Sequence, residues 1–220
     1  MIKLRSQSNY VRALLWLEFG GLFFGLPVVY LLRPRPIPAI PVLLIIFVLC
    51  IVLLIRDPAF ERRSLFRTRQ LAATLRDMLP RMVVVTVLLV GILLSWQPQR
   101  LFDFPRRAPL LWAAVMVGYP LLSVFPQEVI FRAFLFHRYR SLFSDRRYLV
   151  AASAVAFGFM HIVFENWVAV ALTLAGGALF ASTYRRTRSL LPVCVEHAVY
   201  GCLIFTLGWG RLFYLGALER

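Results

Sequence analysis

The chain has 220 residues, of which 60% are hydrophobic and 16% are charged, and its formal net charge is +15. This composition is far more apolar than that of soluble globular domains, so it excludes an ordinary soluble protein and predicts a polytopic membrane protein. The basic residues fall between apolar runs and not along one soluble surface, which argues against nucleic-acid binding. The three cysteines all lie within apolar runs, so we expect no disulfide framework.

Seven apolar runs are each near the length that is needed to cross a bilayer. They are 13–32, 37–55, 80–96, 109–136, 148–164, 167–184 and 189–207. We therefore predict an all-α fold, a polytopic membrane bundle of about seven transmembrane helices. Residues 208–220 are expected to form an interfacial tail or part of an eighth helix, because their aromatic side chains suit the headgroup level.

The orientation follows from the basic residues between the runs. With the N-terminus inside, seventeen of the 25 lysines and arginines fall on the inner side and seven on the outer side, and Arg132 lies within a run. This asymmetry predicts a cytoplasmic N-terminus in a cell membrane, such as a bacterial inner membrane. Apolar residues recur at helical spacing within 71–79, so we expect the connector 56–80 to contain a basic amphipathic helix that anchors on the inner leaflet.

The fourth run contains an ionisable pair, Glu128 and Arg132, whose four-residue spacing sets both side chains on one face of a helix. An ionisable group costs about 2.5–3.5 kcal/mol at the centre of a membrane helix, so it normally faces a partner or a wet cavity. Pro126 precedes the pair, and proline fits best at the first position of a helix. We therefore expect a break near Pro126, with Gln127 and Glu128 in the first turn of the helix that restarts there.

Two histidines, His161 and His197, lie deep within later runs. At about 1.5 Å of rise per residue, Glu128, His161 and His197 lie about 15, 21 and 14 Å from the nearest basic residue on the same membrane face. We expect all three in one layer near the midplane, closer to the cytoplasm than to the outside. Each residue taken singly is more often structural, but a carboxylate and two imidazoles in one pocket can position a water, take its proton and stabilise an oxyanion.

These residues belong to three ordered motifs. The motifs are Gln127-Glu128-Val129-Ile130-Phe131-Arg132, Phe157-x-x-x-His161 and Ser189-Leu190-x-Pro192-x-x-x-x-His197. In order and spacing they resemble the motifs of the CAAX prenyl endopeptidase and bacteriocin-processing (CPBP, or ABI) intramembrane proteases. The resemblance covers roughly residues 105–207, which we expect to form a catalytic core that follows N-terminal membrane helices at 1–104.

The resemblance implies a glutamate-dependent intramembrane endopeptidase whose site opens towards the cytoplasm. In that family a Glu and a His activate water, while a second His and an Asn stabilise the oxyanion. Carried onto this chain, it implies His161 as the histidine that helps to activate water and His197 as the oxyanion donor. Because Gln127 has no carboxylate and Glu128 is the only acidic residue in the fourth run, we expect Glu128 to be the base, with Arg132 as its partner and Gln127 as a residue that orients the peptide or the water. The expected partners are membrane lipid and a membrane-held or lipidated peptide or protein.

The chain departs from the family pattern at two positions. The first motif usually reads Glu-Glu-x-x-x-Arg, and its first carboxylate, usually assigned as the base, is replaced by Gln127; the third motif usually has Asn four residues after its His, where this chain has Gly201. A glutamine does not accept a proton as a carboxylate does, and glycine offers no side-chain donor. Three nearby residues are candidates to compensate, although each fits a structural role better: Glu165, Glu196 and Tyr200.

Two other interpretations and one cofactor stay open. A catalytically inactive relative that binds or scaffolds a membrane partner is favoured by Gln127 and Gly201, whereas a transporter would usually have repeated halves, and none is visible. No cofactor is required by a Glu/His mechanism. A divalent metal such as zinc remains an alternative, because His161, His197 and Glu128 offer three ligands to which water would be the fourth.

Overall fold

The computed structural model describes residues 9–33 and 37–213. In this part of the chain the regular elements are all helical, and seven helices are long and apolar enough to cross a membrane. These seven spans are Asn9–Leu32, Ala39–Arg56, Leu71–Trp96, Pro109–Arg138, Arg146–Phe164, Trp167–Thr187 and Leu190–Leu207. The predicted all-α membrane bundle with about seven spans is confirmed. Of the predicted tail 208–220, the structure describes the short 3₁₀ turn η7 (Gly210–Phe213), and residues 214–220 lie outside the described residues.

Three of the spans join several helical elements end to end. The first joins α1 (Asn9–Gly20), the π turn η1 (Gly21–Gly25) and α2 (Leu26–Leu32), and the fifth joins α9 (Arg146–Met160) and the 3₁₀ turn η6 (His161–Phe164). The fourth joins α6 (Pro109–Tyr119), the π turn η4 (Pro120–Val124), α7 (Phe125–Glu128), the π turn η5 (Val129–Phe134) and α8 (Leu135–Arg138). The remaining elements are α3 (Ala39–Arg56), η2 (Arg62–Leu65), α4 (Leu71–Trp96), η3 (Pro98–Arg100), α5 (Asp103–Arg107), α10 (Trp167–Thr187) and α11 (Leu190–Leu207).

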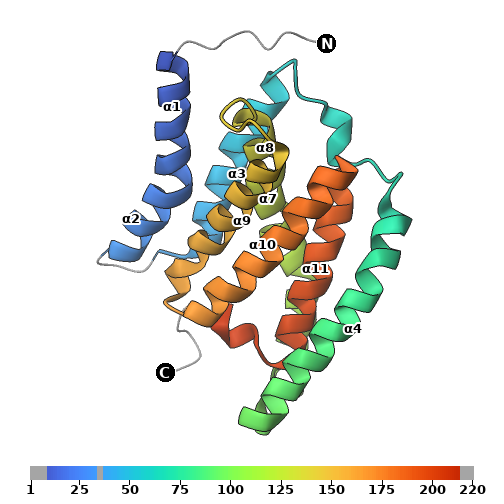
Figure 1. The fold of residues 1–220 in the computed structure, drawn as a ribbon. Coiled ribbons are helices and arrows are strands. Elements are labelled where there is room, and N and C mark those ends of the chain that lie inside the picture. Colours follow the sequence, from blue (N-terminus) through green and yellow to red (C-terminus); the bar gives the residue numbers. More distant parts are fainter. Residues whose placement is uncertain (1–8, 34–36, 214–220) are drawn as a thin grey trace.

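The second half of the fourth span lies inside the bundle. It contacts α3, α9 and α11, while α4 packs on α11 and the first span packs on α9, so that α4 and α1 lie at opposite sides of the molecule (Figure 1). Every residue from Pro126 to Phe136 is buried. The motif with the ionisable pair therefore lies in a fully buried stretch of the fourth span.

The expected break at Pro126 is not present as an interruption, because the helix continues through this proline within the span Pro109–Arg138. The hydrogen-bond pattern does change there: α7 begins at Phe125, with Pro126 at its start and Glu128 in its first turn. The two π turns, η4 and η5, flank the proline. A π turn shifts the backbone hydrogen bonds by one residue, which is one way in which a helix accommodates a residue without an N–H.

The separate amphipathic helix that we expected in the connector 56–80 is also not present. Residues 57–70 are mostly irregular apart from η2, and the apolar residues at 71–79 form the first turns of α4. The helical spacing was therefore read correctly, but it belongs to the start of a 26-residue span and not to a surface helix.

Capping residues and glycines fix the last three spans against one another. Asp145 accepts the backbone N–H of Arg147 at 2.9 Å and begins α9, and Asn166 accepts that of Val168 at 2.9 Å and begins α10. The two helices pack closely, since a Cβ on Gly158 would lie 3.0 Å from the backbone of Leu174. This contact holds the Phe157-x-x-x-His161 motif against α10.

Polar side chains tie the N-terminal spans to α8 at the basic-rich end of the bundle. His137 Nε2 lies 2.7 Å from Asp57 Oδ2, and Glu18 accepts hydrogen bonds from Arg138 at 2.7 Å and from Tyr139 at 2.9 Å. The hydrogen bond from His137 lowers the pKa of Asp57 below its ordinary value, and the backbone N–H of Ala59 adds to the effect. These contacts join residues 1–104 to the remainder of the chain, and the proposed domain division stays a prediction.

Candidate active site

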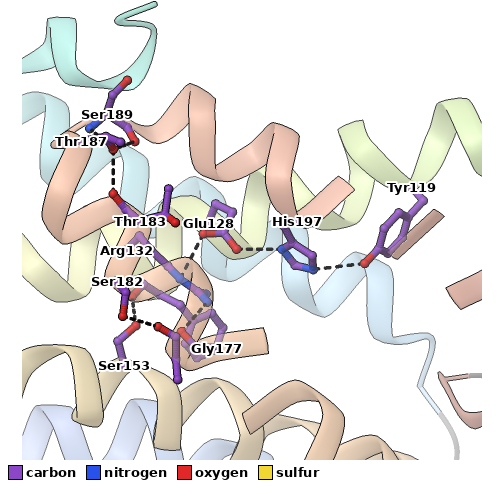
Figure 2. A network of polar contacts seen from close by, with 12 residues as sticks. Tyr119, Glu128, Arg132, Ser153, Gly177, Ser182, Thr183, Thr187, Ser189 and His197 are labelled. Atoms are coloured by element: carbon purple, nitrogen blue, oxygen red, sulfur yellow. Dashed lines mark hydrogen bonds and ion pairs between the residues drawn. The ribbon is translucent and has the colours of Figure 1, made fainter. Parts of the chain in front are cut away.

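Glu128 is the centre of a buried polar network. Its side chain has no exposed surface, its Oε1 lies 2.7 Å from His197 Nδ1, and its Oε2 lies 3.1 Å from Arg132 Nε (Figure 2). The four-residue spacing on one helix places Arg132 beside it, and α11 brings in His197. Both carboxylate oxygens are therefore engaged by groups that carry, or can carry, positive charge.

Arg132 is fully buried and is the largest such side chain among the described residues. Its guanidinium carbon lies 4.4 Å from the centre of the Phe157 ring, and its Nη2 lies 3.5 Å from the carbonyl oxygen of Gly177. The Nη1 atom has no hydrogen-bond partner within the described part of the chain. A buried guanidinium is tolerated only when an anion compensates it, which is the role that the geometry gives to Glu128.

The network fixes the state of His197. A carboxylate only accepts hydrogen bonds, so His197 Nδ1 carries the proton that Glu128 accepts. The other ring nitrogen, Nε2, lies 3.1 Å from the hydroxyl of Tyr119, and the imidazole stacks on Phe180 with 4.6 Å between ring centres. Tyr119, His197 and Glu128 thus form a continuous hydrogen-bonded chain from the fourth span to α11 and back (Figure 2).

His161 does not join this network. Its Nδ1 lies 2.7 Å from the carbonyl oxygen of Phe157, which only accepts, so Nδ1 carries the proton and Nε2 keeps its lone pair. The ring of Phe157 packs against both imidazoles, with ring centres 4.9 Å from His161 and 5.5 Å from His197. This aromatic ring, from the second motif, lies in contact with both histidines.

His161 lines a cavity of about 140 Å³ between the first two spans, the fourth span and η6. Gln127 and Ser123 line the same cavity, whose other walls are mostly aliphatic and aromatic side chains from η1, α2, α3, η5 and η6. Gln127 Nε2 donates to Ser123 Oγ at 2.6 Å, whereas Gln127 Oε1 is buried without a hydrogen-bond partner within the described residues. The cavity therefore combines an imidazole acceptor, an amide acceptor and a hydroxyl in apolar surroundings.

The structure thus sorts the five predicted site residues into two groups. Gln127 and His161 face the cavity, while Glu128, Arg132 and His197 form the network and are not among the cavity residues. The cavity also reaches Tyr30 and Phe164, near the ends of α2 and η6. These ends lie away from the basic-rich end of the bundle, whereas the depth argument favoured a site closer to that end.

The residues that flank the motifs lie outside the cavity. Glu165 is exposed at the end of η6, and Glu196 is fully buried and accepts a hydrogen bond from Arg81 at 3.0 Å. The hydroxyl of Tyr200 is buried without a partner among the described residues. None of the three lines the cavity, and their structural role stays a prediction.

The donor atoms of two of the three suggested zinc ligands are committed to other partners. Both ring nitrogens of His197 and both oxygens of Glu128 are in hydrogen bonds or ion pairs, and His161 belongs to the separate cavity group. Among the described residues, no three His, Cys, Asp or Glu side chains cluster as metal ligands would. The arrangement does not fit a three-ligand zinc site, and we assign no step to a metal.

Sequence reasoning missed Tyr119 and Ser123. Both lie N-terminal to the first motif, and Tyr119, Ser123 and Gln127 follow one another at intervals of four residues. That spacing marks one face of a helix and was the available signal. This spacing was not used because a break was expected at Pro126, and a break would have separated Tyr119 and Ser123 from the motif.

Comparisons with known proteins support the resemblance. The family model of the Rce1-like type II CAAX prenyl endopeptidases matches residues 109–203, which contain all three motifs. A search of curated proteins and a search of solved structures each found no match to the chain. With seven membrane-capable helices, the molecule is a multi-pass membrane protein. Over residues 109–203, the chain carries the sequence pattern of the Rce1-like type II CAAX prenyl endopeptidases, a family of membrane proteases within the CPBP group.

Proposed function

We propose that the chain is an intramembrane endopeptidase that hydrolyses a membrane-held peptide in the cavity lined by Gln127 and His161. The observation that carries the proposal is the presence of two acceptors in this cavity: Nε2 of His161, because Nδ1 carries the proton, and Oε1 of Gln127, which is buried without a hydrogen-bond partner among the described residues. A buried acceptor without a partner calls for a donor. A water molecule has two O–H donors, so one water would satisfy both acceptors.

His161 is the base in this arrangement. Its Nε2 takes a proton from the water as the water oxygen attacks the peptide carbonyl, and the resulting imidazolium returns the proton to the leaving amine. Nδ1 stays bonded to the Phe157 carbonyl throughout, which holds the ring in one orientation. General-base help of this kind is typically worth about 10²–10⁴ in rate.

Ser123 lines the cavity and can donate a hydrogen bond to the oxyanion. Its oxygen accepts from Gln127 Nε2, so its own hydroxyl hydrogen is free to donate into the cavity. The role first assigned to His197, donation to the oxyanion, would need its Nε2 to leave Tyr119. Likewise, Glu128 would act as the base only after leaving His197 and Arg132, and in the present arrangement it orders the helix that presents Gln127.

The apolar walls favour a substrate that is itself apolar. Side chains such as Phe23, Leu43 and Ile46 line the cavity, and they would pack against hydrophobic peptide side chains or an attached lipid. The N-terminal helices thus take part in substrate binding, and the expected partners remain membrane lipid and a membrane-associated peptide or protein.

A second candidate is a catalytically inactive relative that binds a membrane partner in the same cavity. One observation favours it: among the described residues, no carboxylate lines the cavity, since Gln127 stands where the family usually has a glutamate. Such a protein would bind an apolar peptide without cleaving it.

Cleavage of quenched fluorescent peptides, lipidated and unlipidated, by the purified protein in bicelles separates the two candidates. We expect wild type to cleave and His161→Ala to lose at least a hundredfold in rate. His137→Ala is the matched control, because His137 lies outside the cavity and pairs with Asp57. Binding of the peptide by wild type without any cleavage would instead support the inactive relative.

A further inference from the structure

The family pattern usually has an asparagine at the position of Gly201. In this chain the side chain of Tyr119 fills the space beside Gly201 that a side chain at position 201 would need. A Cβ built on Gly201 would lie 2.3 Å from both Cε1 and the hydroxyl oxygen of Tyr119. Contacts below 3.0 Å essentially never occur, so no side chain at position 201 is compatible with the present place of Tyr119. The glycine and the tyrosine therefore depend on each other, although they lie on α11 and on α6.

The tyrosine ring is fixed in this space. It packs edge-on against Phe205, with 5.1 Å between ring centres, and against His197, with 6.1 Å. Its hydroxyl lies 3.1 Å from His197 Nε2. Since His197 Nδ1 donates to Glu128, Nε2 of the neutral ring is an acceptor and the hydroxyl of Tyr119 donates to it.

We propose that Tyr119 is a positioning residue that satisfies His197 from the fourth span, in the space that the glycine at position 201 leaves open. The phenol and the carboxylate hold opposite sides of one imidazole, so the ring keeps a single tautomer and a single orientation. Removal of the hydroxyl leaves Nε2 buried without a donor, because His197 is only 5% exposed. The fixed orientation of His197 affects the cavity through the ring of Phe157, which packs against both histidines, and through the helix that carries Gln127. Only the expected effect on cleavage rests on the proposed function.

Nitrogen NMR of the imidazoles tests the hydrogen bond without any need for activity. The chain has only three histidines, so labelled protein gives at most three sets of ring signals, which His137→Gln and His161→Gln assign. We expect Tyr119→Phe to shift the Nε2 signal of His197 and to leave both signals of His161 in place. An unchanged His197 Nε2 signal in Tyr119→Phe would overturn the proposal.

A double-mutant cycle tests the dependence of the two residues on each other. Gly201→Asn alone should lower the unfolding midpoint, because the new side chain meets the Tyr119 ring, and Tyr119→Ala in the same chain should recover part of that loss. Tyr119→Phe should not recover it, since the ring remains. Additive effects of Gly201→Asn and Tyr119→Ala would show that the two positions do not share this space, and would refute the proposal.

The rate measurement follows only if wild type cleaves. We expect Tyr119→Phe to lower kcat by about three- to tenfold with little change in KM, as expected for one hydrogen bond to a positioned group. A shift in the pH profile should accompany the loss, which a purely structural residue would not produce. Inactive wild type would contradict the proposed function alone, because the NMR and stability results stand without it.

Discussion

The imidazole of His197 lies 2.7 Å from the carboxylate of Glu128, so the first and third motifs are joined directly by a hydrogen bond. The same carboxylate is paired with Arg132 at 3.1 Å. Both partners compensate the carboxylate, because a buried charge without a partner is costly in a low-dielectric interior. The neighbouring residue, Gln127, faces the cavity, so adjacent positions of one motif have different surroundings.

The first prediction concerns this buried pair. Arg132→Ala should reduce the folded yield severely, because it leaves the Glu128 carboxylate uncompensated, which generally costs about 3–5 kcal/mol, and removes a large buried side chain. Glu128→Gln should be milder, since the amide oxygen can still accept from His197. Size-exclusion chromatography in a mild detergent at matched expression measures both.

A double variant sharpens this test. Glu128→Gln with Arg132→Met removes both charges and should recover part of the yield that Arg132→Ala loses. Single variants that accumulate like wild type would show that the two residues do not form a buried pair.

The second prediction concerns pH. Because the pKa of Asp57 is lowered, its carboxylate stabilises the fold at pH values above its ordinary value of 3.8, and the contribution is lost as the pH falls through the lowered pKa. Asp57→Asn should lower the unfolding midpoint by a few degrees at most at pH 6, since the pair is well exposed. The difference from wild type should shrink as the pH falls below 3.8 and vanish below the lowered pKa. A deficit that persists there would assign the effect to the turn, where Asp57 accepts the N–H of Ala59 at 2.8 Å.

The sequence was sufficient to predict the seven membrane spans and the pairing of Glu128 with Arg132 across one turn of a helix. A bilayer imposes a length on each apolar run, and four-residue spacing places Glu128 beside Arg132 whatever the tertiary fold. The local course of the fourth span was not predictable in the same way. Pro126 disfavours an α-helix, but the π turns on either side change the hydrogen-bond pattern, and no residue type signals a π turn reliably.

The site could be predicted only in part, because its geometry depends on tertiary contacts. Depth arithmetic gives the position of a residue along the membrane normal and says nothing about the direction in which its side chain points. It therefore placed Glu128, His161 and His197 in one layer but could not reveal that the Phe157 ring packs against both histidines. The place of Tyr119 follows from the missing side chain at Gly201, which only a packed structure shows.

The third prediction concerns orientation. The basic asymmetry predicts that residues 97–107 lie outside and that residues 137–147 are cytoplasmic. Single cysteines at Gln99 and Ser144, both exposed, report on the two sides in a background without the three native cysteines. On intact cells an impermeant thiol reagent should label the cysteine at position 99, and the one at 144 only after lysis. The reverse pattern would invert the orientation and place the cavity in the cytoplasmic half.

The last prediction concerns the residue beside the base. Gln127→Glu introduces a carboxylate into the cavity next to His161 and restores the pair of glutamates that the family motif usually has. A carboxylate accepts a proton where an amide does not, so we expect cleavage to rise by about 10²-fold over wild type, at the lower end of the range of about 10²–10⁴ that is typical of general-base catalysis. Gln127→Met is the matched control, because it keeps the side-chain length without the amide, and it should fall below wild type. An inactive wild type with an active Gln127→Glu would identify the chain as an inactive relative that retains the site. Equal rates for wild type, Gln127→Glu and Gln127→Met would show that position 127 does not contact the reacting water, and would contradict the proposed site.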